Sequence, residues 1–211
     1  MGDVDGVPPY HTTKVPPGTT LKTQELYVGQ AIEFCKTVLK DKSRPDSDRA
    51  LAICWLCHLV ADSHHPCHAG SLYVEDVFPD GDRGANSIRI KQGRNMHSLW
   101  DGLLGRGYDP GDIRRRITEI RSEQSLLQTT GLKPSIETDP MVWLKESREL
   151  SKTYVYTPEV LEPITVAMRA GSTEVATVNL PEGYLKRAGR VAQLRAIQAS
   201  ERLARVLSEG L

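Results

Sequence analysis

The sequence has no long hydrophobic run and no excess of charge of either sign, and each absence excludes a class of protein. No apolar stretch reaches the about 20 residues that a membrane-spanning helix needs, so no membrane span is expected. The 27 basic and 27 acidic residues give a formal net charge of zero. Proteins that bind nucleic acid through a basic surface are usually more basic than this. If the substrate carries phosphates, the positive charge must be local, and a bound metal ion is one source of it.

Cysteine is scarce as well. Four cysteines among 211 residues are too few for a disulfide scaffold. Three of them, Cys35, Cys54 and Cys57, fall in apolar helical segments, where buried free thiols are expected. The first residues do not read as a signal peptide. The localisation therefore stays open between a cytosolic protein and a chain that begins part-way into a longer one.

The hydrophobic residues that are present recur mostly at helical spacing. Capping residues and Asp-Pro pairs mark several helix starts. The predicted helices cover residues 23–39, 46–64, 95–104 and 181–207, and two more begin at Pro110 and Pro140. Residues 73–78 and 87–90 predict a short strand pair, and a weaker β-like pattern covers 171–180. The expectation is an all-α, multi-helix single domain over residues 1–211 with one short β-like loop region.

The residues that indicate chemistry are histidines and aspartates at helical spacing. His58 and Asp62 are four residues apart, so they share one face of a helix, and His97 and Asp101 repeat that spacing. Further histidines, including His64 and His68, lie at the exit of the first helix. Imidazole and carboxylate ligands of this kind suit zinc. A single such pair is more often a hydrogen-bonded pair than a ligand set, and the spacing alone leaves that alternative open.

A second motif overlaps the first. Cys54-Trp-Leu-Cys57-His58 is a formal match to the attachment motif of c-type haem. That motif is short, it lies here inside an apolar helical run, and haem attachment requires an exported chain. Zinc is therefore the favoured cofactor, with a haem protein as the alternative.

Three ordered blocks of sequence resemble the zinc-dependent single-strand nucleases and 3′-nucleotidases of fungi and plants, a family related in fold to bacterial zinc phospholipase C. The blocks are HLVADSHHPCH at 58–68, DRGAN at 82–86 and NMHSLWD at 95–101. Weaker agreement continues to the C-terminal helix, so the resemblance covers nearly the whole chain. It implies an α-helical domain of the phospholipase C type and up to three zinc ions in one cleft.

The resemblance also implies roles for single residues. Asp62 corresponds to an aspartate that bridges two zinc ions and contributes to catalysis. His58 and, more loosely, His11 correspond to ligands of the first zinc ion. A complete protein ligand set for another zinc ion, with open positions for water or phosphate, corresponds to His68, His97 and Asp101. Apart from the resemblance, Arg83 in the second block is a candidate catalytic residue that contacts a phosphate from its loop, and a solvated loop residue is the alternative.

Several positions depart from the family pattern. Histidine stands at 65 where the family has glutamine, and alanine stands at 85 where it has glycine. The family's N-terminal zinc ligands have no counterpart, because the chain starts ten residues before His11. The resemblance therefore implies a family member that lacks its N-terminal part. Members are typically secreted or periplasmic, although this chain shows no signal peptide.

The expected function is zinc-dependent hydrolysis of phosphodiester bonds in nucleic acid by metal-activated water, as an endonuclease or a 3′-nucleotidase. The expected partner is a single-stranded nucleic acid or a nucleotide as substrate, without an obligate protein partner. The alternative is a catalytically inactive zinc-binding remnant of the family. Related proteins also include phospholipases, so the sequence leaves the substrate open.

Overall fold

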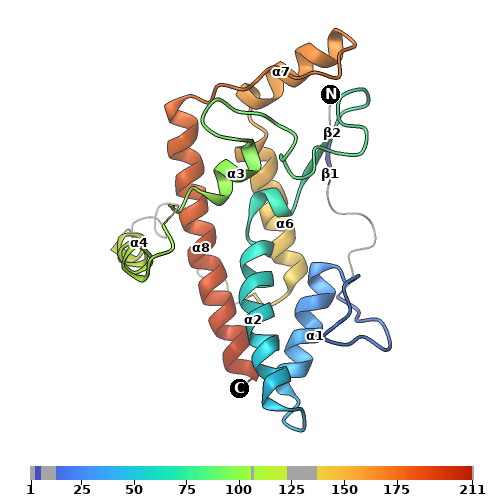
Figure 1. Ribbon diagram of the computed structural model, residues 1–211, viewed down its shortest axis with the longest axis vertical. Helices are drawn as coiled ribbons and strands as arrows, with labels where there is room; N and C mark the ends of the chain where they lie inside the picture. The colour runs from blue at the N-terminus through green and yellow to red at the C-terminus, as the bar shows by residue number, and fades with distance from the viewer. Residues whose placement is uncertain (1–2, 6–12, 106, 123–136, 211) are drawn as a thin grey trace.

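The computed structural model describes residues 3–5, 13–105, 107–122 and 137–210, and these are mostly helical (Figure 1). The all-α fold class predicted from the sequence is therefore confirmed. Strands among the described residues are short: β1 (Asp3–Asp5) pairs antiparallel with β2 (Ser71–Tyr73). No described helix is long and apolar enough to cross a membrane.

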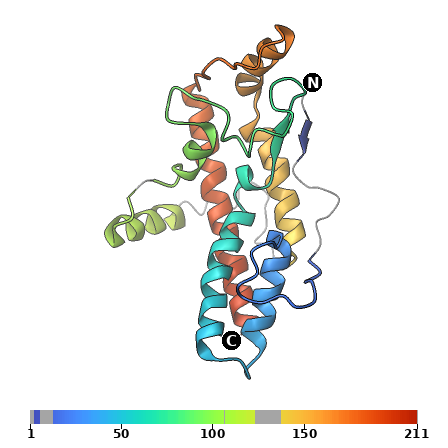
Figure 2. The same cartoon turned by 45° about the vertical axis from the view of Figure 1, so that its right-hand side comes forward.

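Four helices form the body of the molecule. They are α1 (Val28–Lys40), α2 (Asp46–Ser63), α6 (Pro140–Leu150) and α8 (Glu182–Gly210). These helices run side by side along the long axis in both views (Figures 1 and 2), and α2 contacts the other three. Their facing sides share a buried core whose largest fully buried members are Ile32, Leu39, Leu56 and Trp143. The helical spacing of apolar residues in the sequence places these side chains on one face of each helix, where they pack together.

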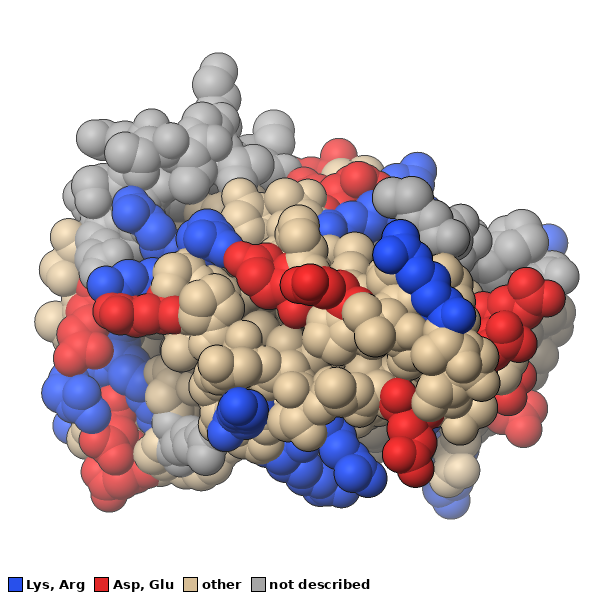
Figure 3. Space-filling model, turned by 90° about the horizontal axis from the view of Figure 1, so that it is seen from above, with Lys and Arg blue, Asp and Glu red and all other residues tan. Residues whose placement is uncertain are grey.

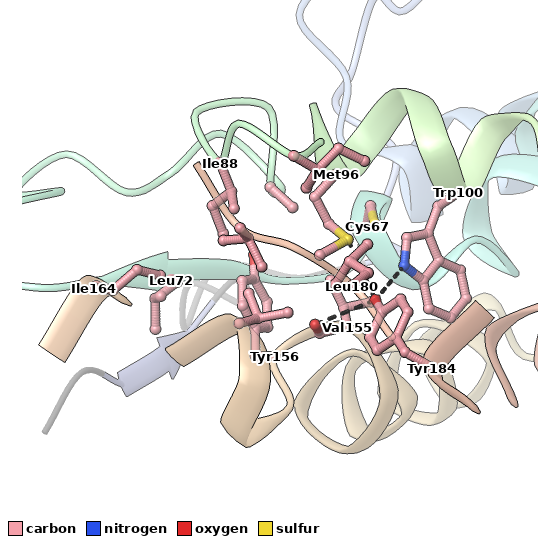
Figure 4. Packing of buried hydrophobic residues seen from close by; sticks show 14 of the residues in the cluster. Cys67, Leu72, Ile88, Met96, Trp100, Val155, Tyr156, Ile164, Leu180 and Tyr184 are labelled. Carbon is pink, nitrogen blue, oxygen red and sulfur yellow. Dashed lines mark hydrogen bonds between the residues drawn. The ribbon is translucent and has the colours of Figure 1, made fainter. Parts of the chain in front are cut away.

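A second core lies near the start of α8, under α3 (Met96–Asp101) (Figure 4). In it the indole nitrogen of Trp100 donates a hydrogen bond of 3.0 Å to the hydroxyl of Tyr184. Both side chains are almost completely buried, so this bond satisfies polar atoms that burial would otherwise leave unpaired. Burial of Trp100 fixes the short helix α3 against α8, and the next residue along the chain is Asp101.

The helix starts predicted from Asn95 and from the two Asp-Pro pairs are confirmed. In contrast, α2 is preceded by Pro45, which supplies no side-chain cap, and the helix predicted from residue 23 starts at Val28. α2 begins at Asp46, and α4 covers Pro110–Ser122. The side chain of Asn95 accepts a hydrogen bond from the backbone of Ser98 at the start of α3. The side chain of Asp139 likewise accepts one from the backbone of Met141 at the start of α6. Each cap satisfies a backbone N–H group that has no partner inside its helix.

The predicted strand pair between residues 73–78 and 87–90 is wrong. Tyr73 ends β2, and Val74 forms a bridge with Phe78 within a tight turn. Ile90 instead forms bridges with Gly93 and with the distant Val178. Long-range contacts of this kind depend on the tertiary fold, so the local β-type pattern does not reveal the partner.

Two segments had no prediction. The π-helix η2 (Ser151–Val155) continues α6, and α7 (Pro158–Arg169) follows it at one end of the molecule (Figure 1). Seen from that end, basic and acidic side chains are interspersed in small groups (Figure 3), in keeping with the zero net charge. Among the described residues, this face shows no broad basic surface, so attraction for phosphates on this face would have to come from a local site.

The expected burial of the cysteines is correct for Cys35 and wrong for Cys54 and Cys57. Cys35 and also Cys67 are buried, whereas Cys54 and Cys57 are exposed on α2. α2 is apolar around most of its circumference, and its core contacts are made by Ala52, Leu56 and Val60. The two exposed cysteines lie off that face, together with the half-exposed Trp55.

Candidate metal centre

The two His–Asp pairs singled out in the sequence come together at the junction of three short segments. The C-terminal half of α2 carries His58 and Asp62, and the 3-10 turn η1 (Pro66–His68) that follows ends on His68. α3 carries His97 and Asp101. α2 ends before Pro66 because the residue preceding a proline avoids the helical conformation. That turn brings His68 back toward Asp62.

Each carboxylate lies between two imidazoles. Oδ2 of Asp62 is 3.3 Å from Nε2 of His58 and 3.3 Å from Nδ1 of His68. Oδ1 of Asp101 is 3.7 Å from Nε2 of His97. It is also 3.4 Å from Nε2 of His65, a residue that no sequence argument placed in the centre.

The rings of His68 and His97 connect the two pairs. They stack with centroids 5.0 Å apart and planes inclined by 26°. The centroid of the His65 ring lies 4.7 Å from that of His68 and 5.6 Å from that of His97. The pairs predicted on separate helices thus form one cluster of imidazoles and carboxylates.

The electrostatics of the cluster suit a cation. Burial favours the neutral form of Asp62, but its hydrogen bond with His68 and the neighbouring imidazoles outweigh burial and lower its pKa. The hydrogen bond with Asp62 raises the pKa of His68. Burial, followed by the charges of His68 and His97, lowers the pKa of His65 to about 3. Asp62 is therefore ionised and His65 neutral at pH 7, which are the forms that bind metal ions. The raised pKa of His68, in contrast, favours its protonated form, which has to lose its proton before it binds one.

The chemistry of the donor set also fits zinc. Among the residues that the structure describes, the candidate ligand atoms of His65, His68 and Asp101 all lie within 4.8 Å of one another. Nitrogen and carboxylate oxygen at such spacing are the usual ligands of zinc. Both ring nitrogens of His65 are buried without a hydrogen-bond partner, which is costly unless a ligand satisfies them.

A backbone carbonyl orients His97. Nδ1 of this ring lies 2.7 Å from the carbonyl oxygen of Gly84. Nδ1 therefore carries the proton and donates a hydrogen bond to this oxygen. The lone pair of Nε2 then remains free on the side of Asp101. Zinc-binding histidines typically have such an outer partner, because it fixes both the tautomer and the direction of the ring.

The loop that supplies this carbonyl has an unusual backbone. Arg83, Gly84 and Ala85 follow one another with φ angles of 60°, 62° and 67°. Left-handed residues other than glycine are strained by about 1–2 kcal/mol each. The buried carboxylate of Asp82 holds the loop in place, because it accepts hydrogen bonds from the backbone of Leu72 and from the hydroxyl of Tyr156. Burial together with the charge of Asp82 raises the pKa of Tyr156, so its hydroxyl stays protonated as the donor.

A Gly84→Ala substitution tests this loop. A Cβ atom at this position would overlap the carbonyl oxygen of Cys67, and the left-handed φ adds further strain. We expect a loss of at least about 2 kcal/mol in the free energy of unfolding, together with weaker zinc binding, because the acceptor of His97 shifts. Chemical denaturation and a zinc competition titration measure the two effects.

Gly189→Ala is the matched control for Gly84→Ala. A Cβ atom there meets no neighbour within 4 Å, and Gly189 lies inside α8. This variant should be more stable by about 0.4–1 kcal/mol, as for other glycines in helices. Equal stability of the Gly84→Ala variant and the native chain would show that the loop tolerates a side chain and that our account of it is wrong.

His64, one of the histidines that the sequence places at the exit of α2, is engaged in a different network. Its ring is almost fully buried and lies against the ring of Trp143, with centroids 5.2 Å apart. Nδ1 donates to the carbonyl of Val60 at 2.7 Å, and Nε2 accepts from Arg202 at 2.9 Å. Burial and then the charge of Arg195 lower the pKa of His64 to about 3, so it is neutral in this network. Both nitrogens are already engaged, and His64 is a structural residue.

The remaining candidates differ in what the structure shows. His11 lies outside the described residues. Arg83 is exposed in the loop next to Gly84, and its side chain makes no hydrogen bond or ion pair with the part of the chain that the structure describes. A pocket of about 230 Å³ opens beside the cluster and is lined by Asp62, His65, His68 and Asp101 on one side. α8 closes its other side with small residues, among them Ala192, Ala196 and Ala199.

His65 is the residue that the sequence reasoning missed. The sequence indicated it only as a departure from the family's glutamine. One signal in the sequence could have indicated it. His65 is itself an imidazole, and it stands only three residues before the proposed ligand His68. Helical spacing does not rank the three histidines at this exit, because the chain leaves the α-helix at Ser63.

Comparisons with known proteins identify the family of the chain. The model of the S1/P1 nuclease family matches residues 9–211. Endonuclease 3 of Arabidopsis thaliana is 27% identical over 165 residues, which are 74% of this chain and 50% of the relative. Endonuclease 4 of the same plant is 26% identical over 163 residues, which are 74% of this chain and 49% of the relative. The chain thus spans about half the length of the curated relatives that it matches. From its match over residues 9–211, the chain belongs to the S1/P1 nuclease family.

Proposed function

We propose that this chain is a zinc-dependent phosphoesterase that hydrolyses phosphodiester bonds of nucleic acid. The observation that carries the proposal is the position of Asp62, whose Oδ2 lies 3.3 Å from imidazole nitrogens on both sides. A carboxylate in this position is suited to hold a metal ion together with His58, next to the ligands around Asp101. Membership of a nuclease family and the names of the two relatives support the choice of substrate.

The residues of the chain have separate tasks in this proposal. His58 and Asp62 would hold one ion, and His68, His97 and Asp101 the other. Bound zinc supplies the activation of water and the neutralisation of charge on the phosphoryl oxygens. The carbonyl of Gly84 keeps the His97 ring in the ligand tautomer. Because the ligands are set by α2, η1 and α3, the geometry depends on how these segments pack.

The surroundings of the cluster suit a phosphodiester. The pocket beside it has a wall of small alanine side chains from α8, which leaves room for a bulky group next to the phosphate. Arg83 lies on the loop that contacts His97, and its exposed guanidinium would bind a phosphate of the substrate. Local charge of this kind removes the need for a basic surface, and the chain has zero net charge.

Hydrolysis of a single-stranded oligonucleotide before and after chelation tests the proposal. The protein is incubated with a strong chelator, freed of it, and then given zinc or magnesium back. We expect cleavage to disappear on chelation and to return with zinc, because the nitrogen-rich ligand set favours zinc over magnesium. Cleavage that survives complete removal of the metal would refute the mechanism.

A second function has one observation in its favour. The ligand atoms around Asp101 are closely grouped, whereas the side chain of His58 is 63% exposed and Asp62 is its one ion-pair partner among the described residues. An inactive protein that binds one zinc ion as a structural centre would have this uneven arrangement. The number of zinc ions per chain separates it from the enzyme.

A further inference from the structure

We propose that His65 is itself a ligand of the zinc ion held by His68, His97 and Asp101, so that this ion has three imidazole ligands and one carboxylate. The inference rests on the proposed zinc site and deepens it. It concerns a residue at which this chain departs from the sequence pattern of its family. Three observations carry it: the position of the ring, its unpaired nitrogens and the packing that fixes it.

The position of the ring is that of a ligand. Nε2 of His65 is 3.4 Å from Oδ1 of Asp101, which is closer than Nε2 of His97 at 3.7 Å. Two atoms bound to one zinc ion at about 2.0–2.1 Å in a tetrahedral arrangement are separated by about 3.4 Å. The candidate ligand atoms of His65, His68 and Asp101 lie within 4.8 Å of one another, so a small movement of side chains brings all three to one ion.

Among the described residues, the ring nitrogens of His65 have no hydrogen-bond partner of regular geometry, and the polar groups beside the ring include the carboxylate of Asp101, 3.4 Å from Nε2, and the backbone of Trp100. Both are buried and neither makes a hydrogen bond, although the side chain as a whole is 21% exposed toward the pocket. An unsatisfied buried polar group costs about 1–3 kcal/mol. His64, one residue earlier, has partners at both nitrogens. The contrast assigns the two adjacent histidines to different tasks, one structural and one ligating.

The packing around His65 fixes the direction of its ring. Its backbone N–H donates to the carbonyl of Asp62, and its own carbonyl accepts from the backbone of His68, both at 3.0 Å. The indole of Trp100 lies edge-on to the ring with centroids 6.4 Å apart. These contacts hold the imidazole over the cluster before any ligand binds, which lowers the entropic cost of binding an ion.

Four protein ligands are the number that zinc takes in a closed site. An ion held by all four would be bound tightly, independently of ligands outside the described residues. Water and substrate would then reach the neighbouring position at Asp62 and the exposed His58. With His65 as a ligand, the ion at Asp101 would be held tightly, and the ion at Asp62 would be the one that water and substrate reach.

His65→Gln, which introduces the residue of the family pattern, is the test. Zinc affinity is measured by competition with a coloured chelator, and the number of imidazole ligands by X-ray absorption at the zinc edge. We expect the affinity for the tightest ion to fall at least about 10-fold, since even changes outside the ligand shell have effects of about 10- to 100-fold. The native chain with one zinc ion should show three imidazoles and the variant two.

His58→Gln is the matched control, with the same substitution at the neighbouring position. It should leave the tightest ion unchanged. Two imidazoles in the native chain, or unchanged affinity in His65→Gln, would overturn the inference whether or not the protein cleaves nucleic acid. Three imidazoles without any cleavage would leave His65 as a ligand and refute the proposed function instead. The X-ray measurement on the native chain does not depend on the folding of any variant.

Discussion

The His97→Ala variant is expected to lose one bound zinc ion and, with it, the hydrolysis of single-stranded nucleic acid. The substitution removes a ring whose Nδ1 is held by the carbonyl of Gly84 and whose Nε2 faces Asp101. Affinity for the ion should fall by at least about 100-fold, because loss of a ligand exceeds the about 10- to 100-fold effect of losing an outer partner. Elemental analysis after gel filtration measures the zinc content, and cleavage of an oligonucleotide measures the activity.

Arg94→Ala is a suitable control for His97→Ala. Arg94 is exposed just before the same helix α3 and belongs to no part of the cluster. Its replacement should leave the zinc content unchanged. Unchanged zinc content in the His97→Ala variant as well would sink the assignment of this metal centre.

Glu146→Gln is expected to give the largest loss of stability. Glu146 accepts hydrogen bonds of 2.7 and 2.9 Å from Arg202 and one of 2.8 Å from Arg195. Both arginines are almost completely buried, with side chains 1% and 4% exposed. Removing the negative charge leaves two buried cations without compensation. Breaking a buried ion pair in this way costs about 3–5 kcal/mol, which chemical denaturation at pH 7 should show.

The same glutamate has a consequence for pH. Burial tends to raise the pKa of Glu146, but its hydrogen bonds with Arg202 and Arg195 outweigh burial and lower it below the ordinary 4.5. A carboxyl group with a lowered pKa stabilises the fold above its unfolded-state pKa, and this stabilisation is lost as the pH falls through the folded-state value. The stability difference between the native chain and Glu146→Gln should therefore shrink below pH 4.5.

Glu149→Gln is the control on the same helix. Glu149 is 69% exposed and pairs only with Lys152 among the described residues. Its replacement should change stability by less than about 0.5 kcal/mol. If Glu146→Gln were equally mild, the buried network would not be what secures the exit of α2.

This network also concerns function, because it secures the backbone next to the metal centre. Arg195 donates to the carbonyl of His64 at 3.0 Å, and the hydroxyl of Ser147 donates to the carbonyl of Ser63 at 2.8 Å. Through these hydrogen bonds, α6 and α8 fix the backbone at the end of α2, directly before His65. Small displacements of this backbone would move His65 and His68, the proposed ligands that follow along the chain.

Much of the fold could be predicted because its signals are local. Asn95 and Asp139 occupy the cap positions that their neighbours in sequence indicated. The start of α7 was missed, although Thr157-Pro158 carries the same type of signal as Asp139-Pro140. The bridge between Ile90 and Val178 could not be predicted, because it joins segments far apart in the chain.

The site divides in the same way. The spacing of four residues in each His–Asp pair correctly indicated that His58 faces Asp62 and that His97 faces Asp101. The roles of His64 and His65 could not be read from spacing, because contacts with α8 decide them. Arg202 donates a hydrogen bond to the buried ring of His64, whereas the ring of His65 lies beside Asp101. α2 ends at Ser63, so helical spacing does not predict the directions of the His64 and His65 side chains that follow.

The number of zinc ions per chain, counted by elemental analysis after loading with zinc and gel filtration, tests the central claim most directly. Our account predicts two ions, one held around Asp101 and one shared between His58 and Asp62. One ion per chain would contradict the two-metal account and favour a structural zinc centre, and the absence of bound zinc would contradict both functions.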